Sequence, residues 1–256
     1  MKRKRLAGVI FCTLIVLFAV SCKTSSQAQV DRVLRDVGKV LSGGEDQLTT
    51  DQVIAGLKEA LSQGISNGSD QASAVDGYLK NQFIRIVFPP DAAKVESRLR
   101  QIGLGAEVDK FIVSMNRGAE RAAKEAKPIF LQAIKSMTIE DAWGILKGEE
   151  DSATKYLQRT TSASLEKKFL PIITQSLNEV NATRYYTDLV NTYNKIPLVE
   201  KVNPDLNQYV TGKAIDGLFV LVAEEEAKIR RDPAARTTAL LKKVFGNQSG
   251  IGQSRY

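Results

Sequence analysis

The chain contains no histidine and only two cysteines among its 256 residues. Without histidine there is no Ser–His–Asp or Cys–His nucleophile system, no histidine acid or base, and none of the usual zinc sites. Cys12 lies in a segment that we expect to be removed, so Cys22 has no partner for a disulfide. The fold must therefore be held by its core.

Other common binding motifs are also missing. There is no GxxxxGK[ST] phosphate loop, and Gly103 and Gly105 lack the preceding strand that a dinucleotide fingerprint requires. The net charge is +7, but four basic residues and no acids lie within residues 1–21, which leaves +3 for the remainder. We expect no cofactor, no bound metal and no nucleic-acid partner.

The N-terminus has the pattern of a bacterial export signal. Four basic residues precede the apolar run Leu6–Val20, which is shorter than the roughly 20 residues of a membrane span. Ala19-Val20-Ser21-Cys22 resembles a lipobox, in which Cys22 is lipidated; an ordinary signal peptide before a free thiol is the alternative. Lys23 replaces the aspartate that signals inner-membrane retention, so the resemblance implies an outer-membrane anchor facing the periplasm. A soluble periplasmic protein is the alternative location.

The remainder divides into three parts. Residues 22–47 predict a lipidated tether with a short helix, residues 48–246 a helical domain, and residues 247–256 a disordered tail. A stretch with β character, Phe83–Phe88, has no second strand to pair with. It is expected to lie extended on helices.

The helical domain is organised around residues 203–231. Asn203 is a suitable N-cap, Pro204 suits the first turn, and Ala214–Ala223 is apolar on nearly every side. Such a helix must be surrounded by other helices. The predicted fold class is therefore all-α: a single multi-helix domain around a buried helix in its C-terminal third, with little or no β-sheet.

Two breaks in helices are expected. Asn67-Gly68 is a turn signal that should fray the helix beginning after Thr49. Pro171 lies inside a strong helical pattern and should kink or split that helix.

Several long motifs resemble one bacterial family. They are GLKEALSQGIS (56–66), FPP (88–90), KPIFLQAIKSMTIEDAWGILKG (127–148), ATKYLQRTTSASLEKKFLPII (153–173), YNKIP (193–197), NPDLNQYVTGKAIDGLF (203–219) and DPAARTTALLKKVFG (232–246). Together they are similar to the family of unknown function DUF4197, from about Leu48 to Gly246. The resemblance implies a helical domain, often behind a signal peptide. It implies no activity, cofactor or catalytic residue.

Two acidic features have competing interpretations. Asp216, within the apolar run, would be a general base if desolvation raised its pKa, but pairing with Lys213 is favoured. Glu224, Glu225 and Glu226 point about 100° apart on a helix and cannot converge on one ion. A solvated turn with i,i+4 pairs to Lys228 and Arg230 is expected, although inward pairing of one glutamate is the alternative.

A possible ligand pocket gathers tyrosines near an amide and an arginine. Its candidate residues, with Tyr185 and Tyr186 as neighbours, are Tyr193, Asn194, Tyr209, Asp216 and Arg236. Core packing and helix capping are the alternatives.

The leading hypothesis is a non-enzymatic lipoprotein that binds a protein or small-molecule ligand at the outer membrane. The alternatives are a carboxylate-based hydrolase of envelope glycan, and a lipid or small-molecule carrier with an apolar cavity of about 300 Å³ or more.

Overall fold

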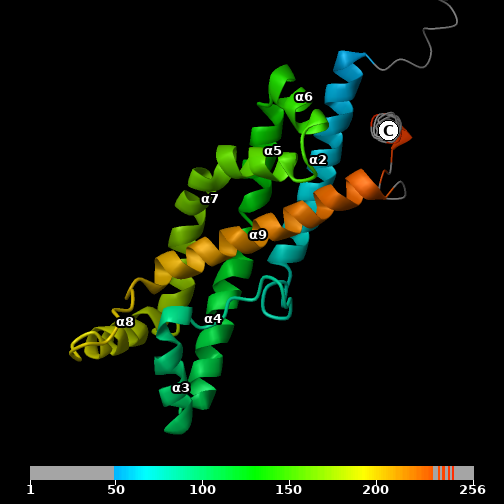
Figure 1. Ribbon diagram of the computed structural model, residues 1–256. Coiled ribbons are helices and arrows are strands. Elements are labelled where there is room, and N and C mark those ends of the chain that lie inside the picture. Colours follow the sequence, from blue (N-terminus) through cyan, green and yellow to red (C-terminus); the bar gives the residue numbers. More distant parts are fainter. Residues whose placement is uncertain (1–48, 233–235, 237, 240–241, 243, 245–256) are drawn as a thin grey trace, which may run out of the picture. The chain divides into compact units, whose positions relative to one another are not determined.

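The computed structural model describes residues 49–232 and the single positions 236, 238, 239, 242 and 244. This part of the chain holds eight α-helices and no β-strand, which confirms the all-α prediction (Figure 1). Its helices belong to one compact unit, Thr50–Tyr256. None of the described helices is long and apolar enough to cross a membrane. The predicted signal peptide, Cys22, the segment 22–47 and the tail 247–256 lie outside the described residues.

The elements follow one another through short connections, except before η1 and before α9. They are α2 (Thr50–Ser73), the 3₁₀ helix η1 (Pro90–Ala92), α3 (Ala93–Gln101), α4 (Gly105–Ala123), α5 (Ala126–Lys135), α6 (Ile139–Lys147), α7 (Ser152–Asn178), α8 (Ala182–Tyr193) and α9 (Leu206–Arg231).

Helix α9 lies across α2, α4 and α7, as the central-helix prediction requires (Figure 1). Leu218 and Leu221 are fully buried, whereas Val220 faces outward, so α9 keeps one exposed stripe. The predicted start was wrong by two residues. Asp205 is the N-cap, because its carboxylate accepts a hydrogen bond from the backbone N–H of Gln208 at 3.0 Å.

The expected turn at Asn67-Gly68 was also wrong, because α2 continues to Ser73. An added Cβ on Gly68 would meet Leu221 at 3.5 Å, and one on Gly64 would meet the Cβ of Glu225 at 3.3 Å. Both glycines therefore let α2 and α9 approach closely, and the gain in packing outweighs the weak helix propensity of glycine.

Pro171 does not split α7, which is continuous over 27 residues. Leu165, Phe169 and Ile173 on either side of the proline are fully buried. Proline removes one helix hydrogen bond, and burial of these flanking side chains against α4 and α9 keeps the helix intact.

Candidate functional site

A groove of about 1070 Å³ opens between the α3–α4 hairpin and the corner where α7 meets α8. Ligand sites in proteins have volumes of roughly 300–1,000 Å³ and mostly apolar linings. The larger apolar side chains that line this groove are Phe88, Leu99, Leu104, Val108, Phe111, Val113, Val180, Tyr185, Tyr186 and Leu189. Its size and chemistry are those of a binding site for an apolar molecule.

Three aromatic rings pack together in this lining. The centroids of Phe88 and Phe111 are 5.1 Å apart, and Tyr186 lies 6.0 Å from each of them. The Tyr186 hydroxyl donates a hydrogen bond to the carbonyl of Asn203 at 3.3 Å, and burial raises its pKa. Tyr186 therefore stays neutral, and the cluster gives the groove a firm apolar surface.

Other lining residues are exposed to water. Leu104, Val113 and Val180 are each more than a third exposed, and Tyr185 is 66% exposed. A contiguous apolar surface of this kind marks binding sites more often than it occurs by chance. A ligand in the groove would remove this surface from water, which is the main source of affinity for apolar molecules.

The charges around the groove balance. The ionisable lining residues are Lys110, Arg117 and Arg121 on the basic side, and Glu107, Asp109 and Glu179 on the acidic side. Arg121 donates to Glu179 at 2.7 Å and to the hydroxyl of Ser176 at 3.3 Å. With three charges of each sign, the groove has no strong preference for an anion or a cation, so apolar contact decides what binds.

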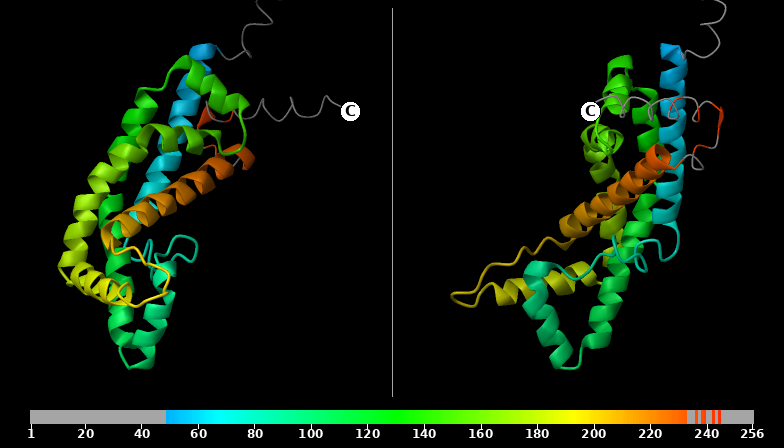
Figure 2. Two further views of the ribbon diagram at one scale, coloured as in Figure 1. Left: turned by 60° about the vertical axis from the view of Figure 1, so that its left-hand side comes forward. Right: turned by 45° about the vertical axis from the view of Figure 1, so that its right-hand side comes forward.

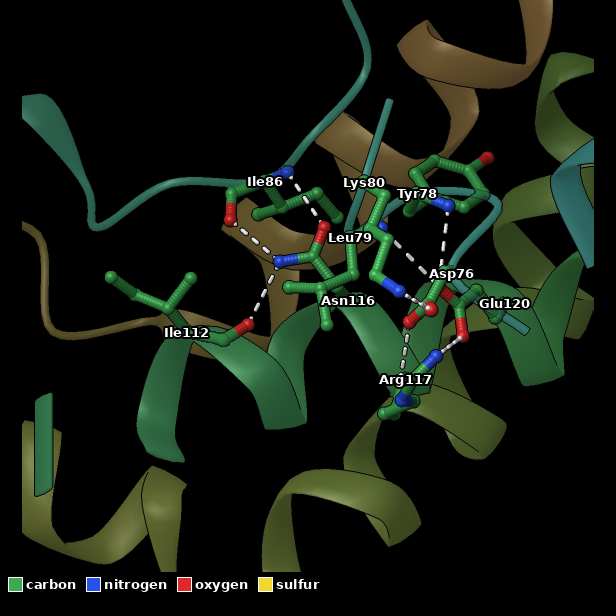
Figure 3. A network of polar contacts seen from close by, with 9 residues as sticks. All are labelled: Asp76, Tyr78, Leu79, Lys80, Ile86, Ile112, Asn116, Arg117 and Glu120. Atoms are coloured by element: carbon green, nitrogen blue, oxygen red, sulfur yellow. Dashed lines mark hydrogen bonds and ion pairs between the residues drawn. The ribbon is translucent and has the colours of Figure 1, made fainter. Parts of the chain in front are cut away.

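Asn116 of α4 places the segment that carries Phe88. Its amide oxygen accepts from the N–H of Ile86 at 2.9 Å, and its amide nitrogen donates to the carbonyl of Ile86 at 2.8 Å (Figure 3). Ile84, Ile86 and Phe88 are buried while the residues between them are exposed. Phe83 and Ile84 lie in a turn, where the N–H groups of Ile84 and Arg85 bond to the carbonyl of Asn81, so the extended segment predicted over 83–88 is confirmed only for its later part. Asn116 supplies the pairing that a second strand would otherwise provide.

A buried carboxylate holds the preceding turn. Glu120 accepts hydrogen bonds from the N–H groups of Tyr78 and Leu79, at 3.2 and 3.3 Å (Figure 3). Arg117 bridges Glu120 and Asp76, at 2.6 Å to each. Hydrogen bonds from Lys80 and then Arg117 hold the pKa of Asp76 below its ordinary value. The turn is thereby fixed to α4, and the extended segment leaves it in a defined direction.

Three of the predicted pocket residues lie near the start of α9. Asn194 bonds both backbone groups of Val202, accepting at 2.9 Å and donating at 2.8 Å. The Tyr209 hydroxyl donates to the carbonyl of Val87 at 3.2 Å, and Tyr193 ends α8 with its side chain half-buried. Asn194 and Tyr209 thus bind backbone groups of neighbouring loops.

The other two predicted pocket residues, Asp216 and Arg236, lie further along α9 and beyond its end. Asp216 is exposed and pairs with Lys213 at 3.4 Å, so the apolar surroundings that a general base needs are absent. Arg236 donates to the carbonyls of Ile229 and Arg230 at the end of α9, at 3.0 and 2.8 Å. Ile229 is 20 residues beyond Tyr209, or roughly 30 Å along a helix. The structure does not bring the five residues together in one pocket.

The expectation of a solvated acidic turn was wrong for Glu225 and Glu226, which are both buried. Glu226 accepts from the N–H groups of Ala153 and Thr154 at 3.0 and 2.8 Å, and pairs with Arg230 at 2.8 Å. It therefore caps the N-terminus of α7 across the helix interface. The predicted i,i+4 pair with Arg230 is confirmed, and the inward-pairing alternative is correct.

Sequence reasoning placed Tyr185 and Tyr186 near a ligand but missed the wall formed by α4. A signal was present, because Val113 lies about 100° outside the apolar stripe that Val108, Phe111, Ile112 and Met115 form on this helix. An apolar side chain outside the buried stripe calls for a second apolar contact. In the structure Val113 lines the groove, where a bound ligand would supply that contact.

Comparison with known proteins gives a family but no activity. A family model described as "Protein of unknown function (DUF4197)" matches residues 47–246. No curated protein and no solved structure matches the chain. The chain belongs to the DUF4197 family.

Proposed function

We propose that this protein is a non-enzymatic, lipid-anchored binding protein of the periplasmic face of the outer membrane. Its ligand is an amphiphile whose acyl chain occupies the α3–α4–α7–α8 groove. The single observation that carries the proposal is the groove itself, with its volume of about 1070 Å³ and its apolar lining. That volume exceeds the roughly 300 Å³ that a carrier of lipids or small molecules requires.

The N-terminal sequence supports the location. The apolar run Leu6–Val20 and the lipobox-like sequence before Cys22 are typical of an exported lipoprotein, with acyl chains attached at Cys22. A protein held at a membrane surface meets lipids at high local concentration. An apolar groove with balanced charges suits a ligand selected by its hydrocarbon part.

The residue inventory favours binding over catalysis. The chain has no histidine, and Asp216, the carboxylate on which a glycan hydrolase would depend, is exposed and ion-paired. Within the groove, Glu179 is engaged by Arg121, and Asp109 lies 2.9 Å from Arg100. These carboxylates serve the structure.

Fluorescence titration tests the proposal. The chain of residues 22–256 with Cys22→Ser lacks both the predicted signal peptide and the acylation site, so it can be studied without detergent. A dansylated undecanoic acid should bind to it with a blue-shifted emission. Val113→Asp should lower the affinity by about tenfold or more, because a carboxylate would have to be desolvated beside the acyl chain.

Val220→Asp is the matched control. Val113 and Val220 are both helical valines that are 39% exposed, and Val220 does not line the groove. The control should bind the probe as the unsubstituted chain does. Absence of binding by the unsubstituted chain, or equal affinities of the two variants, would refute the groove as the site.

A further inference from the structure

The connection between α8 and α9 is a loop closed at its neck. Asn194 bonds both backbone groups of Val202, as an adjacent strand would, at 2.8 and 2.9 Å. Lys201 Nζ also donates to the carbonyl of Asn194. These hydrogen bonds hold the two ends of the loop together and so fix the position of its tip, residues 195–201. In the right-hand view of Figure 2 this yellow-to-orange connection extends beyond the helices beside it.

The tip carries apolar side chains into water. Its sequence is Lys-Ile-Pro-Leu-Val-Glu-Lys, in which Leu198 is fully exposed and Ile196 is half-exposed. Leu198 has a φ of +67°, a region that costs a bulky residue roughly 1–2 kcal/mol. The fold thus holds a strained leucine outward, although hydrophobic burial would favour turning it inward.

Lysines flank this apolar tip. Lys195 and Lys201 are both exposed and lie on either side of Ile196 and Leu198. At a bilayer surface, lysine ammonium groups reach the head groups while neighbouring apolar side chains enter the acyl boundary. Lysine is depleted from protein–protein interfaces. A lipid surface therefore fits this combination better than a protein partner.

We propose that the tip formed by Lys195–Lys201 inserts Ile196 and Leu198 into the interface of a phospholipid bilayer. The inference goes beyond the groove and its ligand, because it rests on a different set of residues. It gives the protein a second membrane contact besides the predicted N-terminal lipid. Helix α8 joins the two features, since Tyr185 and Leu189 line the groove and Tyr193 ends at the neck of the loop.

Residence on a membrane would not test this, because an N-terminal anchor would suffice for it. The test is instead the depth to which the side chain at position 198 enters the bilayer. Trp143 is the sole tryptophan of the chain, so Trp143→Phe leaves a background in which one new tryptophan can be read. The full acylated protein would carry Leu198→Trp in this background. It would be reconstituted in phosphatidylethanolamine–phosphatidylglycerol vesicles containing lipids brominated along their acyl chains.

Emission from Leu198→Trp should shift to the blue and fall about twofold with brominated lipids, because interfacial side chains lie roughly 5–10 Å into the head-group and acyl boundary. The matched control is Ile139→Trp, an exposed position at the start of α6, and Figure 1 shows α6 at the top of the view and α8 at the lower left. The control should remain unquenched. Equal quenching at the two positions, or none at position 198, overturns the proposal. Fatty-acid binding in the groove is measured in a separate experiment. A negative result for membrane insertion of the tip therefore does not affect the groove proposal, and the reverse also holds.

Discussion

The carboxylate of Glu226 accepts a hydrogen bond from the backbone N–H of Thr154 at 2.8 Å, so helix α9 caps the start of helix α7. The side chain of the local cap residue, Asp151, accepts no capping hydrogen bond from the backbone N–H groups of this helix end. Arg230 completes the arrangement by donating to Glu226 and to the carbonyl of Ile145 in α6. One ion pair therefore joins three helices, and its charges are largely shielded from water.

Replacement of Glu226 by glutamine should destabilise the protein by about 3 kcal/mol, because Arg230 loses its buried partner and α7 loses its cap. Urea unfolding should show a lower midpoint at an unchanged slope. Glu224→Gln, two residues earlier and about 200° around the helix on a more exposed face, should change stability by no more than about 0.5 kcal/mol. A similar loss in both variants would contradict the capping role.

Two glycines of α9 should respond to alanine with opposite signs. A Cβ on Gly217 would meet Tyr78 Cε1 at 2.9 Å and Ile84 Cβ at 3.0 Å, whereas one on Gly212 would meet nothing within 4 Å. Gly217→Ala should cost about 2 kcal/mol by overpacking. Gly212→Ala should stabilise by about 0.5–1 kcal/mol through helix propensity. Thermal and urea unfolding of the two variants measure both effects; destabilisation by Gly212→Ala would contradict the packing described for α9.

Asn116→Ala should lower stability and weaken binding in the groove. The substitution leaves the buried N–H and C=O of Ile86 without partners, which costs about 3 kcal/mol in total. It also frees the segment that places Phe88, so affinity for a dansylated fatty acid should fall. Asn191→Ala at an exposed position of α8 is the control and should alter neither quantity. Unchanged fatty-acid affinity of a folded Asn116→Ala protein would show that Asn116 does not help to shape the groove.

Asp76 should make the stability depend on pH on the acid side. Its folded-state pKa is held below the ordinary 3.8 by Lys80 and Arg117. A carboxyl with a lowered pKa stabilises the fold above its unfolded pKa and loses this contribution as the pH falls through its folded pKa. Asp76→Asn tolerates the positive φ of 69° and removes the charge. Wild type should be more stable than the variant at pH 7, and the difference should shrink steadily below about pH 4. A difference that persists undiminished at pH 3 would contradict the role of these ion pairs.

Some features of the fold followed from local chemistry. The helical period predicted an all-α domain and a central helix over residues 203–231, and α9 ends at Arg231 as expected, because such patterns depend on residues within one or two turns. The lack of a partner strand likewise predicted that residues 83–88 form no sheet, although the turn at Phe83 and Ile84 was not expected.

Other signals were interpreted wrongly because a distant element changed their meaning. Gly68 favours a turn in isolation, but Leu221 of α9 makes it a packing position. Glu226 belongs to an acidic run that would be solvated on a lone helix, but the bare N-terminus of α7 makes it a cap.

The amino-acid sequence by itself determined that this chain is helical, that it belongs to the DUF4197 family, and that histidine chemistry is unavailable to it. These properties depend on residue identity and on periodicity along the chain. Only the tertiary structure decided where apolar surface remains uncovered, because that depends on which helices meet. The groove between α4 and α8 and the outward Leu198 exist only once residues far apart in the chain are packed together.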